Sequence, residues 1–208
     1  MEDVDLHLRA SLEALRCEFE LPFFADFDET FADLECWNHN AAIGSDGWRS
    51  TAQGMANSSF FQPQSGFGVA DSIWDPDSLQ NGDFLFVNSD AMPGTVVQQD
   101  TLFTPWLLQE GEDLQLRFLS FFAYGGAEEG QVLLREDGGD GPGAWESRLL
   151  SDDFAVASDS TIGDYPHPQW ARVEHSIVSS SSVAMLQLAF VYAGNWDYGW
   201  AIDDVEMR

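Results

Sequence analysis

Two adjacent aspartates near the C-terminus are the residues whose type and spacing point most clearly to chemistry. Asp203 and Asp204 interrupt an apolar, β-type segment between Ile202 and Val205. Successive side chains of a strand face opposite ways, so at least one of these carboxylates is expected to point inward. A buried carboxylate is costly unless it is paired, hydrogen-bonded or metal-bound. We therefore expect either a bound cation or a carboxylate that accepts backbone N–H groups or contacts an arginine.

Aromatic rings that alternate with polar residues form a second candidate site. One such run comes directly before the last apolar segment, and a second lies in a polar loop near Asp75. Exposed rings beside Asp and Asn suit sugars, which stack on aromatic faces and hydrogen-bond to amides and carboxylates. The alternative is that the rings close the open ends of a folded core. The predicted ligand-binding residues are Trp74, Asn195, Trp196, Asp197, Tyr198 and Trp200.

Motifs for catalysis are missing from the sequence. No nucleophile elbow occurs, and a phosphate-binding loop with lysine is excluded because the chain contains no lysine. The four histidines lie far apart, and we interpret them as surface or hydrogen-bonded residues. Carboxylate pairs are expected by chance among 36 acidic residues, so they do not indicate a glycosidase. We predict no catalytic residues and no enzymatic activity.

The charge of the chain excludes two classes of partner. A formal net charge of −28 leaves no basic surface for a phosphate backbone, and anionic lipids would repel it. Such a surface destabilises the folded state unless salt screens it or cations bind it. A saline, halophilic or marine habitat would supply the salt. Most of the acidic residues are expected to form a solvated shell.

Two cysteines, Cys17 and Cys36, do not have the spacing of a zinc site. They are either a disulfide or two separate buried thiols. No run of 18 apolar residues is present, so we expect no membrane insertion. The acidic N-terminal segment does not have the pattern of a signal peptide.

Apolar segments with period-two alternation recur between Gly, Asp, Asn, Pro and Ser residues, which indicates an all-β chain. Leu114 and Leu116 alternate with Gln115 and Arg117, so one face of their strand is predicted to be buried. The glycine-rich residues 136–143 predict a hairpin connection. The predicted strands are Asp83–Asn88, Asp113–Ala123, Gly130–Arg135, Ala144–Leu150, Trp170–Val178, Ser182–Ala193 and Trp200–Met207.

The predicted domain organisation has two parts. Leucines and alanines in residues 1–16 suit a short helix or a linker, which we interpret as an N-terminal appendage. Residues 17–208 contain no Pro/Gly/Ser-rich linker and are predicted to form a single domain. Residues 49–79 are rich in Ser, Gln, Asn and Gly, and are expected to be loop with short strands.

Several motifs occur in a distinctive order along the chain. The opening carries Cys17, then the run from Leu21 to Asp28, then Cys36-Trp37. Residues 100–105 read DTLFTP, residues 135–139 read REDGG ahead of Trp145, and residues 199–205 read GWAIDDV. From about residue 17 to residue 207, this order resembles the extracellular MAM and cleaved-adhesin-like domains, including the choice-of-anchor J type. The resemblance implies an antiparallel jelly-roll β-sandwich.

The same resemblance implies a structural calcium ion that ties the first and last strands to a nearby loop. Calcium takes six to eight oxygen ligands, so aspartates suit it. The predicted ligands are Asp28, Asp71 and Asp203, with Asp46 and Asp204 as second choices. The resemblance also favours a Cys17–Cys36 disulfide, and with it a secreted or cell-surface location.

Three functions are compatible with these features. The first is a calcium-stabilised, carbohydrate-binding or adhesive module of a larger secreted or surface protein, with a glycan as partner. The second is a module for binding a cell-surface protein partner or for self-association, which an exposed apolar patch would favour. The third, and least favoured, is a secreted hydrolase.

Overall fold

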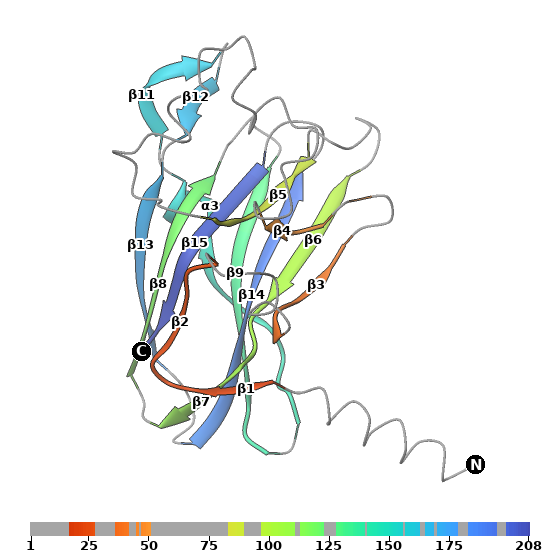
Figure 1. The fold of residues 1–208 in the computed structure, drawn as a ribbon, viewed down its shortest axis with the longest axis vertical. Helices are drawn as coiled ribbons and strands as arrows, with labels where there is room; N and C mark the ends of the chain where they lie inside the picture. Colours follow the sequence, from red (N-terminus) through yellow and green to blue (C-terminus); the bar gives the residue numbers. More distant parts are fainter. Residues whose placement is uncertain are drawn as a thin grey trace, which may run out of the picture.

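The computed structural model describes residues 17–27, 36–41, 45, 47–50, 83–89, 97–110, 113–122, 128–139, 141–155, 157–162, 165–168, 170–178, 183–194 and 199–208. These residues form two β-sheets that pack face to face (Figure 1). The predicted N-terminal appendage, residues 1–16, and most of the predicted loop at 49–79 lie outside the described residues. The division into an appendage and one domain therefore stays a prediction.

The first sheet, sheet A, is organised around β14 (Val183–Gly194). One edge of β14 pairs with β6 (Gln98–Phe103) and then with β7 (Trp106–Glu110), and the other edge pairs with β9 (Glu129–Asp137). The outer strands are β1 (Glu18–Glu20), β3 (Asn38–Asn40) and β10 (Glu146–Leu150).

The second sheet, sheet B, is organised around β15 (Gly199–Met207), which pairs with β8 (Asp113–Phe122). The remaining strands are β2 (Phe23–Ala25), β4 (Arg49–Ser50), β5 (Leu85–Asn88) and β13 (Ala171–Val178). A separate hairpin of β11 (Ala157–Ile162) and β12 (Tyr165–Pro168) lies at one end of the sandwich, and α3 (Ser151–Phe154) follows β10.

The chain crosses repeatedly between the two sheets. The chain passes from β7 in sheet A to β8 in sheet B and back to β9, and later from β13 to β14 to β15. This wiring is that of a jelly roll. The predicted all-β sandwich is confirmed, with one departure from a wholly antiparallel arrangement, because β1 pairs with β7 in parallel.

The predicted alternation of side chains produces the core. Leu186, Leu188, Phe190 and Tyr192 on β14 are completely buried, while Gln115 and Arg117 on β8 remain partly exposed. Each buried aliphatic or aromatic side chain contributes about 1.5–3 kcal/mol relative to its exposed state. The two sheets are therefore held together by their inner faces.

The first and last parts of the described chain meet in sheet B. Ala25 pairs with Val205, and Phe23 pairs with Met207. The register of β15 against β8 shifts between Asp203 and Glu206, which marks a β-bulge. The expectation that the opening and closing strands are neighbours is confirmed.

Two further predictions are confirmed, a disulfide and a hairpin turn. Cys17 and Cys36 form a disulfide that joins the start of β1 to the segment before β3. The hairpin between β9 and β10 places Gly139 and Gly141 at φ values of 100° and 108°, where glycine avoids the strain of a side chain. Within the described residues, no helix is long and apolar enough to cross a membrane.

Candidate functional site

The alternation of side chains along β14 determines which of its residues lie on the outer face of sheet A. Phe190 and Tyr192 are completely buried between the sheets, so Ala189, Val191 and Ala193 point to the opposite face. All three side chains are small or short. Larger neighbours on either side therefore leave a hollow above this central strand.

Strands β6 and β9 supply those neighbours, because the register places one residue of each strand beside each small residue (Figure 1). The three rows across the sheet are Phe103, Ala189 and Leu133; Thr101, Val191 and Gln131; and Gln99, Ala193 and Glu129. These nine residues and Trp145 line a hollow of about 290 Å³, which we call the sheet A groove.

One end of the sheet A groove is aromatic. Trp145 precedes β10, and its ring centroid lies 5.7 Å from that of Phe103 at an interplanar angle of 34°. The guanidinium carbon of Arg135 lies 4.5 Å from the Trp145 ring centroid. Both Trp145 and Phe103 are partly exposed. This end offers a flat apolar surface.

The other end of the sheet A groove is polar. Gln99, Thr101 and Gln131 are exposed or partly exposed and provide amide and hydroxyl groups that can donate and accept hydrogen bonds. Glu129 is exposed and is the only carboxylate among these described lining residues. The groove thus combines an aromatic surface with neutral hydrogen-bonding groups and contains no cationic lining residue.

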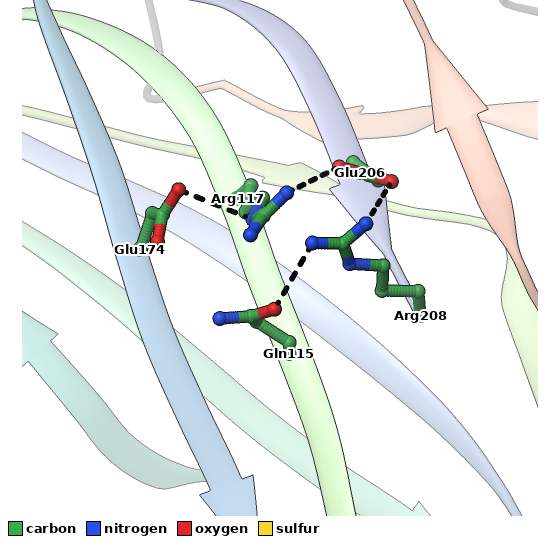
Figure 2. A network of polar contacts seen from close by, with 5 residues as sticks. All are labelled: Gln115, Arg117, Glu174, Glu206 and Arg208. Atoms are coloured by element: carbon green, nitrogen blue, oxygen red, sulfur yellow. Dashed lines mark hydrogen bonds and ion pairs between the residues drawn. The ribbon is translucent and has the colours of Figure 1, made fainter.

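The outer face of sheet B has a different character. Arg117 on β8 lies between Glu174 on β13 and Glu206 on β15, with N–O separations of 3.3 Å and 3.8 Å (Figure 2). Arg208 contacts Glu206 at 3.7 Å and donates to Gln115 at 3.3 Å. These partly exposed ion pairs contribute little stability each, about 0–1 kcal/mol. They join three strands.

The predicted sugar-stacking role of Trp200 is wrong. Its ring is completely buried, stacks on Phe154 with centroids 4.6 Å apart and donates its Nε1–H to the Ser120 hydroxyl at 3.0 Å. Alternation along β15 directs Trp200 and Ile202 to the core, as the alternative interpretation of these rings expected. The other predicted ligand-binding residues lie outside the described residues: Trp74, Asn195, Trp196, Asp197 and Tyr198.

Asp203 is one of the predicted calcium ligands that the structure describes. Its side chain is 2% exposed, and its Oδ1 accepts a hydrogen bond from the Asp204 backbone N–H at 2.8 Å. Asp204 is partly exposed and has a φ of 49°, in the left-handed region. Burial of one carboxylate of the pair was predicted and is observed.

At least one carboxylate of this pair was expected to point inward. Asp203, the buried one, lies opposite Leu119, and Glu206 lies opposite Arg117, so the Asp203 and Glu206 carboxylates lie on the face of sheet B that is turned away from the core between the sheets. Asp28, Asp71 and Asp46 lie outside the described residues. Among those that are described, no three His, Cys, Asp or Glu side chains gather into a metal site. Of the predicted set of ligands, the described residues therefore include Asp203 and Asp204.

The sequence analysis did not identify the sheet A groove. The signal was present in β14, where Ala189, Val191 and Ala193 alternate with the buried aromatic residues and leave the second face of the strand without large side chains. The neighbours that turn this bare face into a groove come from strands about 60 to 90 residues earlier in the chain. Their register is a property of the folded sheet.

Known structures share this fold. Two cleaved adhesin domains of Lys-gingipain from Porphyromonas gingivalis are similar to the chain. The first is 15% identical, with 89% of this chain and 96% of that domain covered and a TM-score of 0.51. The second is 16% identical, with 89% and 97% covered and a TM-score of 0.50. The chain thus has an adhesin-like β-sandwich fold. No protein-family model and no curated protein matches the sequence.

Proposed function

We propose that this chain is a non-catalytic binding module that holds a neutral glycan in the sheet A groove. The observation that carries the proposal is the composition of the groove. Trp145 and Phe103 form an aromatic end, and Gln99, Thr101 and Gln131 provide neutral hydrogen-bonding groups. Binding sites for small polar molecules commonly pair an apolar surface with a few polar groups that fix orientation.

A sugar suits both halves of the groove. The C–H groups on one face of a pyranose ring can pack on an indole, while its hydroxyl groups exchange hydrogen bonds with amides and hydroxyls. The groove runs over three strands and is open to solvent along the sheet, so it fits a segment of an elongated chain. Because its lining has a carboxylate and no cation, a neutral glycan is favoured over an acidic one.

The lining also supports a role without catalysis. Glycoside hydrolysis uses two carboxyl groups about 5–10 Å apart on either side of the scissile bond. Glu129 is the only carboxylate among the described lining residues, and it has no such partner there. We therefore favour binding over hydrolysis at this site.

We further propose that the chain is an extracellular or cell-surface module related to the cleaved adhesins, of the MAM or choice-of-anchor J type. The Cys17–Cys36 disulfide supports this location, because disulfides persist in oxidising compartments. The order of the sequence motifs and the adhesin-like fold support the relationship.

The test of glycan binding compares two aromatic substitutions. Wild type is titrated with neutral hexasaccharides of β-linked glucose, mannose, xylose and galactose, and with oligogalacturonate as an acidic control. We expect at least one neutral glycan to bind, and Trp145→Ala to weaken it at least about tenfold, which is about 1.4 kcal/mol. Phe24→Ala serves as the matched control, since Phe24 is 58% exposed and lies on sheet B.

Two results would reject the proposal. The first is no binding to any neutral glycan in the panel. The second is equal affinity in wild type and the Trp145→Ala variant, which would remove the groove from recognition. Dimerisation of the free chain through an exposed face, measured by light scattering, would instead favour the self-association alternative.

A structural calcium ion at Asp203 is a separate proposal. Asp203 is almost fully buried beside a β-bulge, in a chain that has no lysine to neutralise it. The pairing of β2 with β15 brings the segment before Asp28 to the same region. Calcium would supply charge neutralisation there, and the predicted partners Asp28 and Asp71, with Asp46 and Asp204, would complete its oxygen ligands.

Chelation tests the calcium proposal at a fixed 1 M sodium chloride, so that screening stays constant. A site saturated at 100 times its Kd adds about 2.7 kcal/mol, so EDTA should lower the wild-type Tm by about 5–10 °C. Asp203→Asn should lose most of this response, while Asp152→Asn, at an exposed helical site, should keep it. A wild-type Tm that does not respond to EDTA would contradict the proposal.

A further inference from the structure

Arg135 lies between two indole rings at the aromatic end of the sheet A groove. Its guanidinium carbon is 4.8 Å from the centroid of the Trp106 ring and 4.5 Å from that of the Trp145 ring. Trp106 is 8% exposed and belongs to β7, whereas Trp145 is partly exposed and lines the groove. Arg135 therefore links a buried, fixed ring to the ring at the surface.

Hydrogen bonds fix the orientation of this guanidinium. Arg135 and Gln187 lie directly opposite each other on β9 and β14. The Nε and Nη2 atoms of Arg135 donate to Gln187 Oε1 at 3.1 Å and 2.6 Å. Gln187 Nε2 in turn donates to the Thr104 carbonyl at 2.7 Å, between β6 and β7. The plane of the guanidinium is thus set by Gln187 on β14, which is itself held by the link between β6 and β7.

Trp145 has few other constraints on its position. It follows the glycine-rich turn at 138–143, and the pairing of β10 with β9 begins one residue later, at Glu146. Its other ring contact within the described residues is Phe103, on the far side of the groove. A tryptophan on such a hairpin arm loses side-chain entropy when a ligand fixes it, which weakens binding.

We propose that Arg135 is a positioning residue, which holds Trp145 in its ligand-ready orientation before the glycan arrives. This inference rests on the proposed function of the groove. The role needs arginine, because a planar guanidinium can stack on two rings while its edge donates two hydrogen bonds. A lysine at this position would keep the charge and lose both the stacking and the paired donors.

The first experiment needs no ligand. Indole N–H groups are labelled with nitrogen-15, and the heteronuclear NOE of the Trp145 indole is measured in wild type, Arg135→Met, Arg135→Lys and Arg148→Met. Arg148 is the matched control: it carries the same charge, lies on the neighbouring strand β10 and pairs with Glu146 at 2.9 Å. We expect the NOE to fall in both Arg135 variants and to match wild type in Arg148→Met.

The second experiment uses the neutral hexasaccharide that wild type binds most tightly in the panel above. We expect both Arg135 variants to bind it about five- to tenfold more weakly, and Arg148→Met to bind it within about twofold of wild type. Binding is measured at least 20 °C below the Tm of each variant, so that loss of folded protein does not lower the apparent affinity. If the Arg135→Met variant does not fold, the Arg135→Lys variant is used for the test.

The outcomes separate this inference from the function it rests on. An unchanged Trp145 NOE in the Arg135 variants overturns the positioning role, whatever the glycan result. A lowered NOE with unchanged affinity overturns it as well, since the ring would then be mobile without consequence. If wild type binds no neutral glycan, the proposed function fails and the NOE alone decides whether Arg135 holds the ring.

Discussion

At the scale of single residues, two buried carboxylates are accommodated in different ways. Asp100 is completely buried and accepts hydrogen bonds from the Ser45 hydroxyl at 2.5 Å and from the Gln98 side-chain amide. Asp203 is 2% exposed, and its Oδ1 accepts a hydrogen bond from the backbone N–H of the next residue. Hydrogen-bond donors thus contact both carboxylates, and we propose a cation in addition at Asp203.

Gly130 allows two buried rings to approach the backbone of β9. A Cβ atom at this position would lie 2.6 Å from Phe122 Cε2 and 2.7 Å from Phe154 Cζ. Both rings are 1% exposed and cannot move aside without disturbing the core. We predict that Gly130→Ala lowers the free energy of unfolding by about 1–3 kcal/mol, as measured by urea denaturation.

Gly138→Ala is the control for this prediction, because a Cβ atom there would have no neighbour within 4 Å. It should change the free energy of unfolding by no more than about 0.5 kcal/mol. Equal stability of the two variants would show that the rings around Gly130 are loosely packed.

The residue scale also shows what the sequence could decide about Trp200. Two interpretations were open, a sugar-stacking ring and a ring that closes the core, and the spacing of Trp200 and Ile202 on one strand favours the second. Burial of Trp200 was thus predictable from the same sequence.

At the scale of elements, the strands were predictable because their inner faces are strongly apolar. The predicted strand Ser182–Ala193 corresponds to β14, Val183–Gly194, and the predicted strand Asp113–Ala123 corresponds to β8. The short strand β3 was not predicted, since three residues carry no periodicity, and β4 lies in a segment where short strands were expected without defined bounds. The groove was missed because it depends on the register among three strands that are distant in sequence.

The disulfide belongs to this scale as well, since it ties β1 to the segment that leads into β3. The cysteines are 19 residues apart, and closing a loop of this length stabilises the folded state by about 3 kcal/mol in the chain-entropy model. We predict that replacing both cysteines with serine lowers the free energy of unfolding by about 2–4 kcal/mol.

Reductant provides the check on the cysteine prediction. Dithiothreitol should destabilise wild type by a similar amount and leave the double serine variant unchanged. A wild-type free energy of unfolding that is identical with and without reductant would mean that the bond contributes nothing to stability.

At the scale of the whole molecule, the dominant feature is the net negative charge, which follows from the sequence alone. A net charge of −28 on 208 residues creates strong self-repulsion, which dissolved ions screen over about 30 Å at 0.01 M and about 3 Å at 1 M. We predict that the Tm of the protein, measured with the same calcium concentration throughout, rises between these two sodium chloride concentrations. A Tm that stays constant or falls would show that the acidic shell carries no repulsive cost.

The central claim is that the outer face of sheet A, and not that of sheet B, receives a neutral glycan. Amide chemical-shift mapping during titration with the neutral hexasaccharides tests it residue by residue. We predict shifts concentrated on β6, β9 and β14, around Thr101, Gln131 and Ala193, with β8 and β13 unaffected. Shifts centred on Arg117 and Glu174 on sheet B, or no shifts at all, would contradict the claim.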